Sequence, residues 1–183
     1  MADKEQSLIV LDSWEGGYSN NSRDPGGETY GGISRRMWPN WAGWSVIDQK
    51  KLIHGGHIPW SMKFADLDNL VSDFYTDNFW NKQSFSLLNN QDVCNKIFQH
   101  YVNMGDRAIK ISQNIVFNGI WIDGKLGIHT SSKLNEINSS FFLETYCYQL
   151  SEYYTELISE HPQLEYARHE WMLRAKTIGK RPS

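Results

Sequence analysis

The sequence predicts an all-α fold with a glycine-rich loop or small hairpin after the first helix. Apolar residues recur at helical spacing through most of the 183 residues. Alternating strand patterns are almost missing, and only residues 18–33 look extended and rich in glycine. The length corresponds to about one domain at the usual ~150 residues per domain. We therefore expect a mostly helical chain built around a single core.

The first helix is predicted from three residues that share one face. Leu8, Leu11 and Glu15 stand at positions i, i+3 and i+7. The pair Gly16-Gly17 is expected to end this helix. An acidic residue would therefore lie on the same face as two apolar ones, at the point where the helix stops.

Two further helices are expected before residue 84. Ser45 and Asp48 have the spacing of a capping box, which predicts a short helix that closes at residues 55–56. The next helix is predicted by a stripe that runs toward Trp80 and consists of Leu67, Leu70, Val71, Phe74 and Asn78.

The second half is predicted to hold four helices. Their apolar stripes lie within residues 93–104, 108–118, 143–158 and about 163–176. Polar turn formers in residues 84–92 mark a soft boundary between two helical blocks. We expect a catalytic portion at residues 1–88 and a second helical portion at residues 89–183, packed together as one globular unit.

Composition excludes several classes of protein. The 18 Lys and Arg residues against 21 Asp and Glu residues give a formal charge of −3, which lacks the basic excess of a nucleic-acid binder. No apolar run approaches the ~18 residues of a membrane span. The first residues also lack the pattern of a secretory signal peptide. Cys94 and Cys147 have no metal-ligand spacing, so we expect buried free thiols, as in a reducing cytosol; the alternative is a disulfide bridge between them.

The glycine-rich segment carries the strongest chemical signal. Six glycines fall within residues 16–33, and glycine is the costliest residue to order on folding. Glycines permit a tight backbone and a close approach to a bulky ligand, which suits a cleft. Glu15 precedes them and has Trp14 beside it, so its carboxyl group is expected to be partly desolvated. Desolvation disfavours an ionised carboxylate and suits Glu15 to act as a general acid. The alternative is that Glu15 accepts hydrogen bonds from the glycine-rich backbone.

Asp24 and Thr29 are the next candidates. Hydrolysis of a glycosidic bond commonly uses two carboxyl groups, one to protonate the leaving oxygen and one to stabilise the cation or activate water. Glu15 and Asp24 fit that pair, although Asp24 before Pro-Gly-Gly is also a common turn former. Thr29 is expected to orient a water, or else to bond a neighbouring amide. We expect Glu28 to be exposed to solvent.

Several aromatic and polar side chains are candidates for substrate binding. Sugar rings pack on aromatic planes, so Tyr18, Tyr30 and Trp44 are expected to line a glycan groove. For Trp44 and its neighbours Trp38, Trp41 and Trp60, the alternative is a small helical core. Asn103 is expected to bond an acetamido group or to cap local backbone. His54 and His57 lack a carboxylate at matching spacing, so we expect no metal site and no cofactor.

Motifs along most of the chain resemble one known family. Glu-Gly-Gly-Tyr at residues 15–18 and Asp-Pro-Gly-Gly-Glu-Thr at residues 24–29, followed by Gly-Ile, are similar to the signature of glycoside hydrolase family 108. These are lysozyme-like N-acetylmuramidases that are often described as secretion activator proteins. Further similar motifs stand at residues 74–80, 102–105, 123–130 and 171–175. Gln99 and Ile128 depart from the family pattern, which has an acidic residue and a proline there.

The resemblance implies a lysozyme-like helical fold and a function. Glu15 matches the family's catalytic acid, and the order Glu15, Asp24, Thr29 is also similar to the catalytic triad of bacteriophage lysozymes. The substrate implied is the β-1,4 bond between N-acetylmuramic acid and N-acetylglucosamine in peptidoglycan glycan strands. The portion at residues 89–183 resembles a peptidoglycan-binding portion. A bacterial or prophage source is also implied, with synthesis in the cytoplasm, release by a holin-like route and action at the cell wall. The alternatives are a lytic transglycosylase and a non-catalytic wall-binding or secretion-regulating protein.

Overall fold

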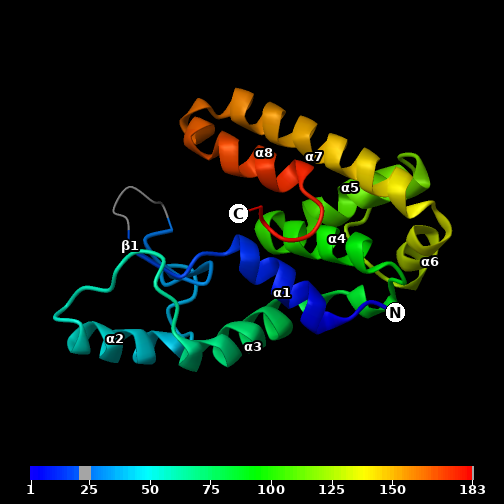
Figure 1. Ribbon diagram of the computed structural model, residues 1–183. Helices are drawn as coiled ribbons and strands as arrows, with labels where there is room; N and C mark the ends of the chain where they lie inside the picture. The colour runs from blue at the N-terminus through cyan, green and yellow to red at the C-terminus, as the bar shows by residue number, and fades with distance from the viewer. Residues whose placement is uncertain (21–25, 183) are drawn as a thin grey trace. The chain divides into compact units, whose positions relative to one another are not determined.

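The computed structural model describes residues 1–20 and 26–182 (Figure 1). Within them the chain divides into two compact units. The helical unit consists of residues 1–14 together with the chain from Phe79 onward, and the sheet unit consists of residues 15–78. In the described residues, eight α-helices accompany one small sheet, which confirms the mostly helical fold. None of the described helices is both long and apolar enough to cross a membrane.

The helical unit is built around helix α4. Every residue from Val93 to Tyr101 of this helix is buried, because α4 packs against α1, α5 and α7. Asn90 caps its first turn by accepting a hydrogen bond from Val93 N at 3.0 Å. Gly105, with φ +61°, follows its last residue, as the sequence predicts. The α-helices of this unit are α1 (Lys4–Trp14), α4 (Gln91–Met104), α5 (Asp106–Phe117), α6 (Ile128–Glu136), α7 (Ser139–Glu160) and α8 (Arg168–Lys176).

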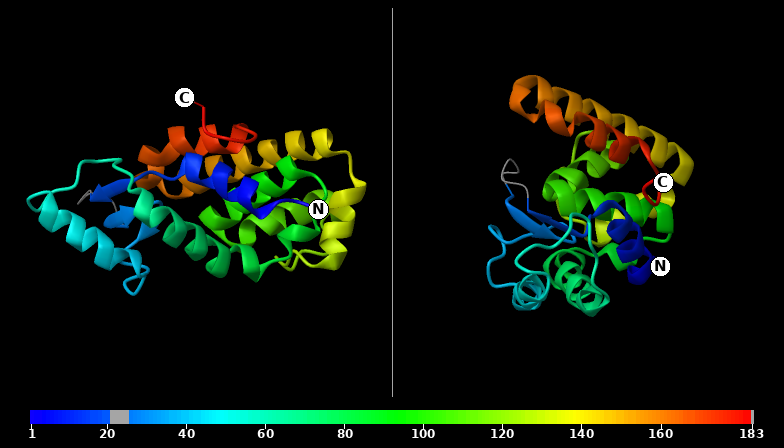
Figure 2. Two further views of the ribbon diagram at one scale, coloured as in Figure 1. Left: turned by 60° about the horizontal axis from the view of Figure 1, so that its bottom comes forward. Right: turned by 60° about the vertical axis from the view of Figure 1, so that its left-hand side comes forward.

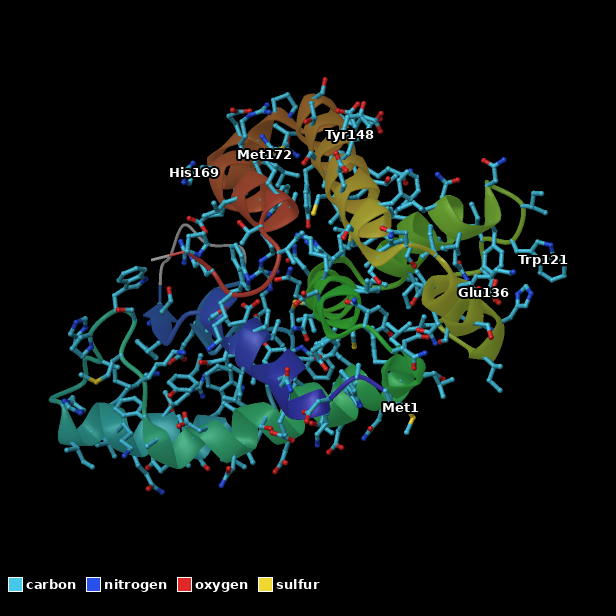
Figure 3. All side chains as sticks on the ribbon, turned by 45° about the vertical axis from the view of Figure 1, so that its right-hand side comes forward. Met1, Trp121, Glu136, Tyr148, His169 and Met172 are labelled. Atoms are coloured by element: carbon cyan, nitrogen blue, oxygen red, sulfur yellow. The ribbon has the colours of Figure 1, made fainter. Side chains whose placement is uncertain are left out.

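Helices α7 and α8 lie side by side in both views of Figure 2. The stripe predicted for residues 143–158 forms the buried face of α7. Only the second part of the helix predicted at 163–176 is α-helical, because residues Pro162–Ala167 form a 3-10 helix. Figure 3 labels Tyr148 and Met172, which line a groove of about 690 Å³ along α7 and α8.

One buried lysine holds the end of α8. The ammonium group of Lys96 donates hydrogen bonds to the carbonyl oxygens of Arg174 at 2.6 Å, Ala175 at 2.9 Å and Thr177 at 2.7 Å. These carbonyls lie at the C-terminal end of α8, where helix carbonyls lack partners within the helix. Burial lowers the pKa of Lys96 to about 8. Lys96 therefore serves as the C-terminal cap of another helix.

The sheet unit contains three short strands and two α-helices. The strands β1 (Tyr18–Asn20), β2 (Glu28–Tyr30) and β3 (Ile33–Ser34) form an antiparallel sheet in the order β1-β2-β3. Tyr18 pairs with Tyr30, and the turn at Gly31-Gly32 joins β2 to β3. The expected small hairpin is thus confirmed and extended by a third strand. The helices are α2 (Gly43–Ile53) and α3 (Asp68–Asn78).

The predicted start of α2 is wrong. The helix begins at Gly43 and has no side-chain cap at Ala42. Ser45 lies inside the first turn and donates to the carbonyl of Ala42 at 2.9 Å. Asp48 accepts hydrogen bonds from the Arg35 guanidinium at 2.6 and 3.0 Å, so it is engaged outside the helix. Capping-box spacing was therefore accidental here.

Both cysteines are free thiols, as expected. Cys94 is buried in α4, and burial raises the pKa of its thiol to about 12. Cys147 is half-buried on α7, and burial also raises its pKa, partly opposed by the nearby Lys96. Neither residue forms a disulfide.

Candidate active site

Glu15 stands immediately after helix α1. The helix was expected to include Glu15 on the same face as Leu8 and Leu11, but it ends one residue earlier, at Trp14. Glu15 is half-buried, and its carboxyl group lies against Gly32 in the turn between β2 and β3. The hydroxyl of Tyr75 on α3 lies against the same point of Gly32 and donates a hydrogen bond to the carbonyl of Gly31 at 2.7 Å. A carboxyl group and a phenol thus meet over one exposed glycine.

Gly32 makes this arrangement possible. Its φ of +76° is a backbone conformation that residues with a side chain rarely adopt. A Cβ atom at this position would overlap the Glu15 carboxylate and lie 2.6 Å from the Tyr75 hydroxyl. Two independent restraints, one on the backbone and one on space, therefore require glycine beside the candidate acid.

Trp14, the last residue of α1, is held by the C-terminal segment of the helical unit. The indole Nε1 of Trp14 donates to the carbonyl of Gly179 at 3.0 Å. The Arg174 guanidinium lies 5.4 Å from the centre of the Trp14 ring, within cation–π range. The backbone N–H of Arg181 donates to the Ser13 hydroxyl at 3.0 Å. These contacts hold the end of α1.

Gly17 serves a second close approach. Its Cβ would overlap the carbonyls of Ser61 and Met62. Tyr18 N donates to Met62 O at 2.8 Å, and Ser61 N donates to Tyr18 O at 2.8 Å. The glycine therefore lets the segment at residues 61–62 pair with β1.

Thr29 lies in the middle of β2 and is half-buried. It is paired with Ser19 of β1 and Ser34 of β3, so these three side chains share one face of the sheet. Tyr18 and Tyr30 project from the other face. Asp24 lies outside the described residues.

The two predicted tyrosines are mostly enclosed. Tyr30 accepts a hydrogen bond from Phe64 N at 2.6 Å, and its ring stacks on that of Phe64. Tyr18 lines a cavity of about 260 Å³ together with Lys51 and Trp60. Burial and a hydrogen bond to Glu28 raise the pKa of the Tyr18 hydroxyl. Tyr30 is thus a core residue, and Tyr18 has access to a small cavity.

Glu28 is not exposed, contrary to the expectation. Its side chain is 13% exposed and forms ion pairs with Arg35 at 2.7 Å and Lys51 at 2.5 Å. Arg35 binds Asp48 through two hydrogen bonds, which lower the pKa of Asp48. The charged network ties β2 to α2. No spacing rule in the sequence connects these residues, since they are brought together by the sheet turn.

The predicted tryptophan cluster divides between core and surface. Trp44 is 3% exposed and donates to the carbonyl of Trp38 at 2.7 Å, which favours the core alternative for this residue. Trp60 is 78% exposed and Trp38 is 37% exposed. Asn103 belongs to the helical unit, where its amide donates to the Tyr154 hydroxyl at 2.9 Å. No group of three or more His, Cys, Asp or Glu residues is placed to hold a metal ion in the described part of the chain.

Comparison with known proteins identifies the family. The model of the family described as glycosyl hydrolase 108 matches residues 9–105, which is more than half of the chain. The chain belongs to glycosyl hydrolase family 108. Membership supports a glycoside hydrolase whose function is related to peptidoglycan, and the matched residues include Glu15, Thr29 and Tyr75.

Solved structures contribute evidence on the fold. The structure of SagA from Brucella abortus matches with a TM-score of 0.58 at 19% identity. The match covers 95% of this chain and 96% of that one, so the two share one fold over nearly their whole length. No curated protein matches the chain.

Tyr75 is the residue of this site that the sequence reasoning missed as a site candidate. It stands in the aromatic motif at residues 74–80, which resembles the family but by itself assigns no role to any of its residues. Helical spacing places Val71 and Tyr75 on one face of α3, and a Cβ atom at Gly31 would lie 3.3 Å from the methyl groups of Val71. That shared face, next to two consecutive glycines, is the signal that would have placed Tyr75 beside Glu15.

Proposed function

We propose that this family 108 protein is an N-acetylmuramidase that hydrolyses the β-1,4 bond between N-acetylmuramic acid and N-acetylglucosamine in peptidoglycan. The proposal rests above all on the Glu15 carboxyl group, half-buried and held beside Gly32 and Tyr75 at the end of α1. Partial burial suits a carboxyl group to general acid catalysis. The surrounding glycines leave the carboxyl next to exposed backbone that a sugar ring can approach.

Glu15 is proposed to donate its proton to the glycosidic oxygen as the bond between that oxygen and the anomeric carbon breaks. A water molecule then adds to the anomeric carbon and returns a proton to the site. Thr29 and Asp24 are proposed to orient this water or to stabilise the oxocarbenium-like transition state. Tyr18 and Asn103 are proposed to contact the glycan. The exposed tryptophans of the cluster, Trp38 and Trp60, are proposed to contact it as well. The reaction needs no cofactor.

We also propose how the two portions of the chain divide catalysis and binding, and how the protein reaches peptidoglycan. Residues 1–88 would carry the catalysis and residues 89–183 the binding to peptidoglycan. Because peptidoglycan lies outside the cytoplasmic membrane, the protein must reach it, and we propose release by a holin-like route from a bacterial cell. In cells that lack a holin, fractionation should then find the protein in the cytoplasmic fraction. Its appearance in the cell-wall fraction of such cells, without lysis, would contradict this route.

Digestion of purified sacculi tests the reaction. A muramidase adds one water per cut and releases reducing N-acetylmuramic acid ends, which mass spectrometry and a reducing-end assay detect. A lytic transglycosylase gives products lighter by one water per cut. A wall-binding protein without catalysis sediments with the sacculi and releases nothing. Either of the last two results would overturn the proposed hydrolysis.

A further inference from the structure

The sheet unit contains a second pocket, which we call the aromatic pocket. It has a volume of about 460 Å³, within the range of small-molecule sites. Residues 37–42 form one wall and the exposed side of α3 forms the other. Neither Glu15 nor Gly32 lines it. Its lining includes the aromatic side chains of Trp38, Trp41 and Phe74 and the carboxylates of Asp73 and Asp77.

The aromatic walls of this pocket are fixed by their own packing. Trp38 meets the Phe74 ring edge-on at a centroid distance of 4.9 Å, and Trp41 meets it at 6.3 Å. The Trp41 indole donates to the carbonyl of Leu70 at 3.3 Å. Gly43 leaves room for the Trp41 ring, because a Cβ there would overlap that ring. The pocket walls are therefore held in place by contacts among the protein's own side chains and backbone.

Two carboxylates complete the pocket. Asp73 and Asp77 are one turn apart on α3, and both side chains are exposed where they line it. Like charges at this spacing destabilise a helix slightly, so helix stability does not explain the pair. None of the pocket-lining residues, all of which are described, is a lysine, arginine or histidine. Aromatic faces and carboxylates both attract cations, and ammonium groups are bound in such aromatic sites.

We propose that the aromatic pocket binds a primary ammonium group of the substrate, away from the candidate acid. The source of this group rests on the proposed function. Peptidoglycan carries primary amines on the side chains of diamino acids in its peptide stems, and on glucosamine units that have lost their acetyl group. Both present an ammonium on an apolar frame, which suits carboxylates set among indole rings.

Calorimetric titration of the full chain distinguishes these sources. One arm uses a stem tetrapeptide with a free side-chain amine and the same peptide acetylated on that amine. The other arm uses a glucosamine tetramer and an N-acetylglucosamine tetramer. The stem peptides contain no glycosidic bond, so their binding does not depend on hydrolysis. Failure of this proposal is therefore distinguishable from failure of the proposed function.

We expect the free-amine member of at least one pair to bind ~10-fold more tightly than its acetylated partner, since acetylation removes the charge. The responding pair identifies the source. Asp73→Asn and Asp77→Asn should each weaken that binding, and the double variant should abolish the preference. Asp68→Asn, on the same helix but outside the pocket, should bind as the wild type does. Circular dichroism confirms that each variant is folded.

Three results would overturn the proposal. These are no binding of either amine, equal binding of the amine and its acetylated form, or an unchanged preference in the folded double variant. Trp38→Ala gives a second check, because it removes part of the aromatic wall without changing the charge. It should weaken binding of the amine if the wall contributes.

Discussion

The helical unit and the sheet unit use glycines and polar groups in different ways. In the helical unit, buried polar side chains such as Lys96 are bonded to backbone and hold helices together. In the sheet unit, Gly17, Gly32 and Gly43 make room for neighbouring groups, and aromatic and acidic side chains remain partly exposed. On the proposed function, we expect the helical unit to provide stability and the sheet unit to provide the chemistry. Substitutions in the two units should therefore affect different measurements.

Among the substitutions that compare the two units, the largest effect is expected in the sheet unit at Gly32. In Gly32→Ala the new methyl group displaces the Glu15 carboxyl, and a displacement of about 1 Å can cost about 100-fold in rate. The release of reducing ends from sacculi measures the loss. Gly27→Ala is the matched control, since Gly27 has a φ of +67° and no atom of the described residues lies within 4 Å of its Cβ position. If both variants lose activity equally, backbone strain rather than the clash is responsible.

In the helical unit, the corresponding test is Lys96→Met. Methionine keeps much of the apolar stem but leaves the three carbonyls of the α8 end without their donor. Buried groups that lose a partner cost about 1–3 kcal/mol, so the free energy of unfolding should fall by at least that range. Urea denaturation measures it. Lys133→Met, at an exposed position on α6, should stay within about 0.5 kcal/mol of the wild type. A larger loss for Lys133→Met than for Lys96→Met would contradict the role given to the buried ammonium.

A smaller effect is expected from the pH dependence of stability at His100. Burial, and then the positive charges of Lys96 and Arg174, lower the pKa of His100 well below 6.5. The unfolded chain therefore binds a proton below pH 6.5 that the folded chain does not. Stability from this group is present above pH 6.5 and is lost as the pH falls, by at most about 1.4 kcal/mol per pH unit.

His100→Gln isolates this contribution, because the amide can still bond the Tyr154 hydroxyl. Urea denaturation between pH 5 and pH 7 should show a shallower loss of stability in the variant than in the wild type. Parallel pH profiles for the two proteins would mean that His100 takes up a proton in the folded state as well.

The helices could be predicted largely from periodicity. Long stripes such as that of α7, and the stop at Gly105, need only the spacing of apolar residues and a glycine. The capping box at Ser45 failed because short polar motifs recur by chance, and Asp48 is instead bound by Arg35 in the turn after β3. The expectation that Glu28 is exposed failed because its ion pairs with Arg35 and Lys51 form only when the sheet folds against α2.

The candidate site was predictable in part. The glycine-rich segment and the acidic residue before it identified Glu15 as the main candidate. The sequence could not show that Tyr75, 60 residues away, lies against the same glycine, because that contact depends on how α3 packs on the sheet turn. Nor could composition separate the buried Trp44 from the partly exposed Trp38, six positions apart.

The most direct test is the hydrolytic activity of Glu15→Gln on purified sacculi. Glutamine keeps the size of the side chain and can form hydrogen bonds, but its amide has no acidic proton to transfer to the glycosidic oxygen. A general acid contributes about 10²–10⁴-fold to the rate, so the release of reducing ends should fall at least ~100-fold while the unfolding midpoint stays near that of the wild type. Release at the wild-type rate by the folded variant would contradict the assignment of Glu15 as the acid.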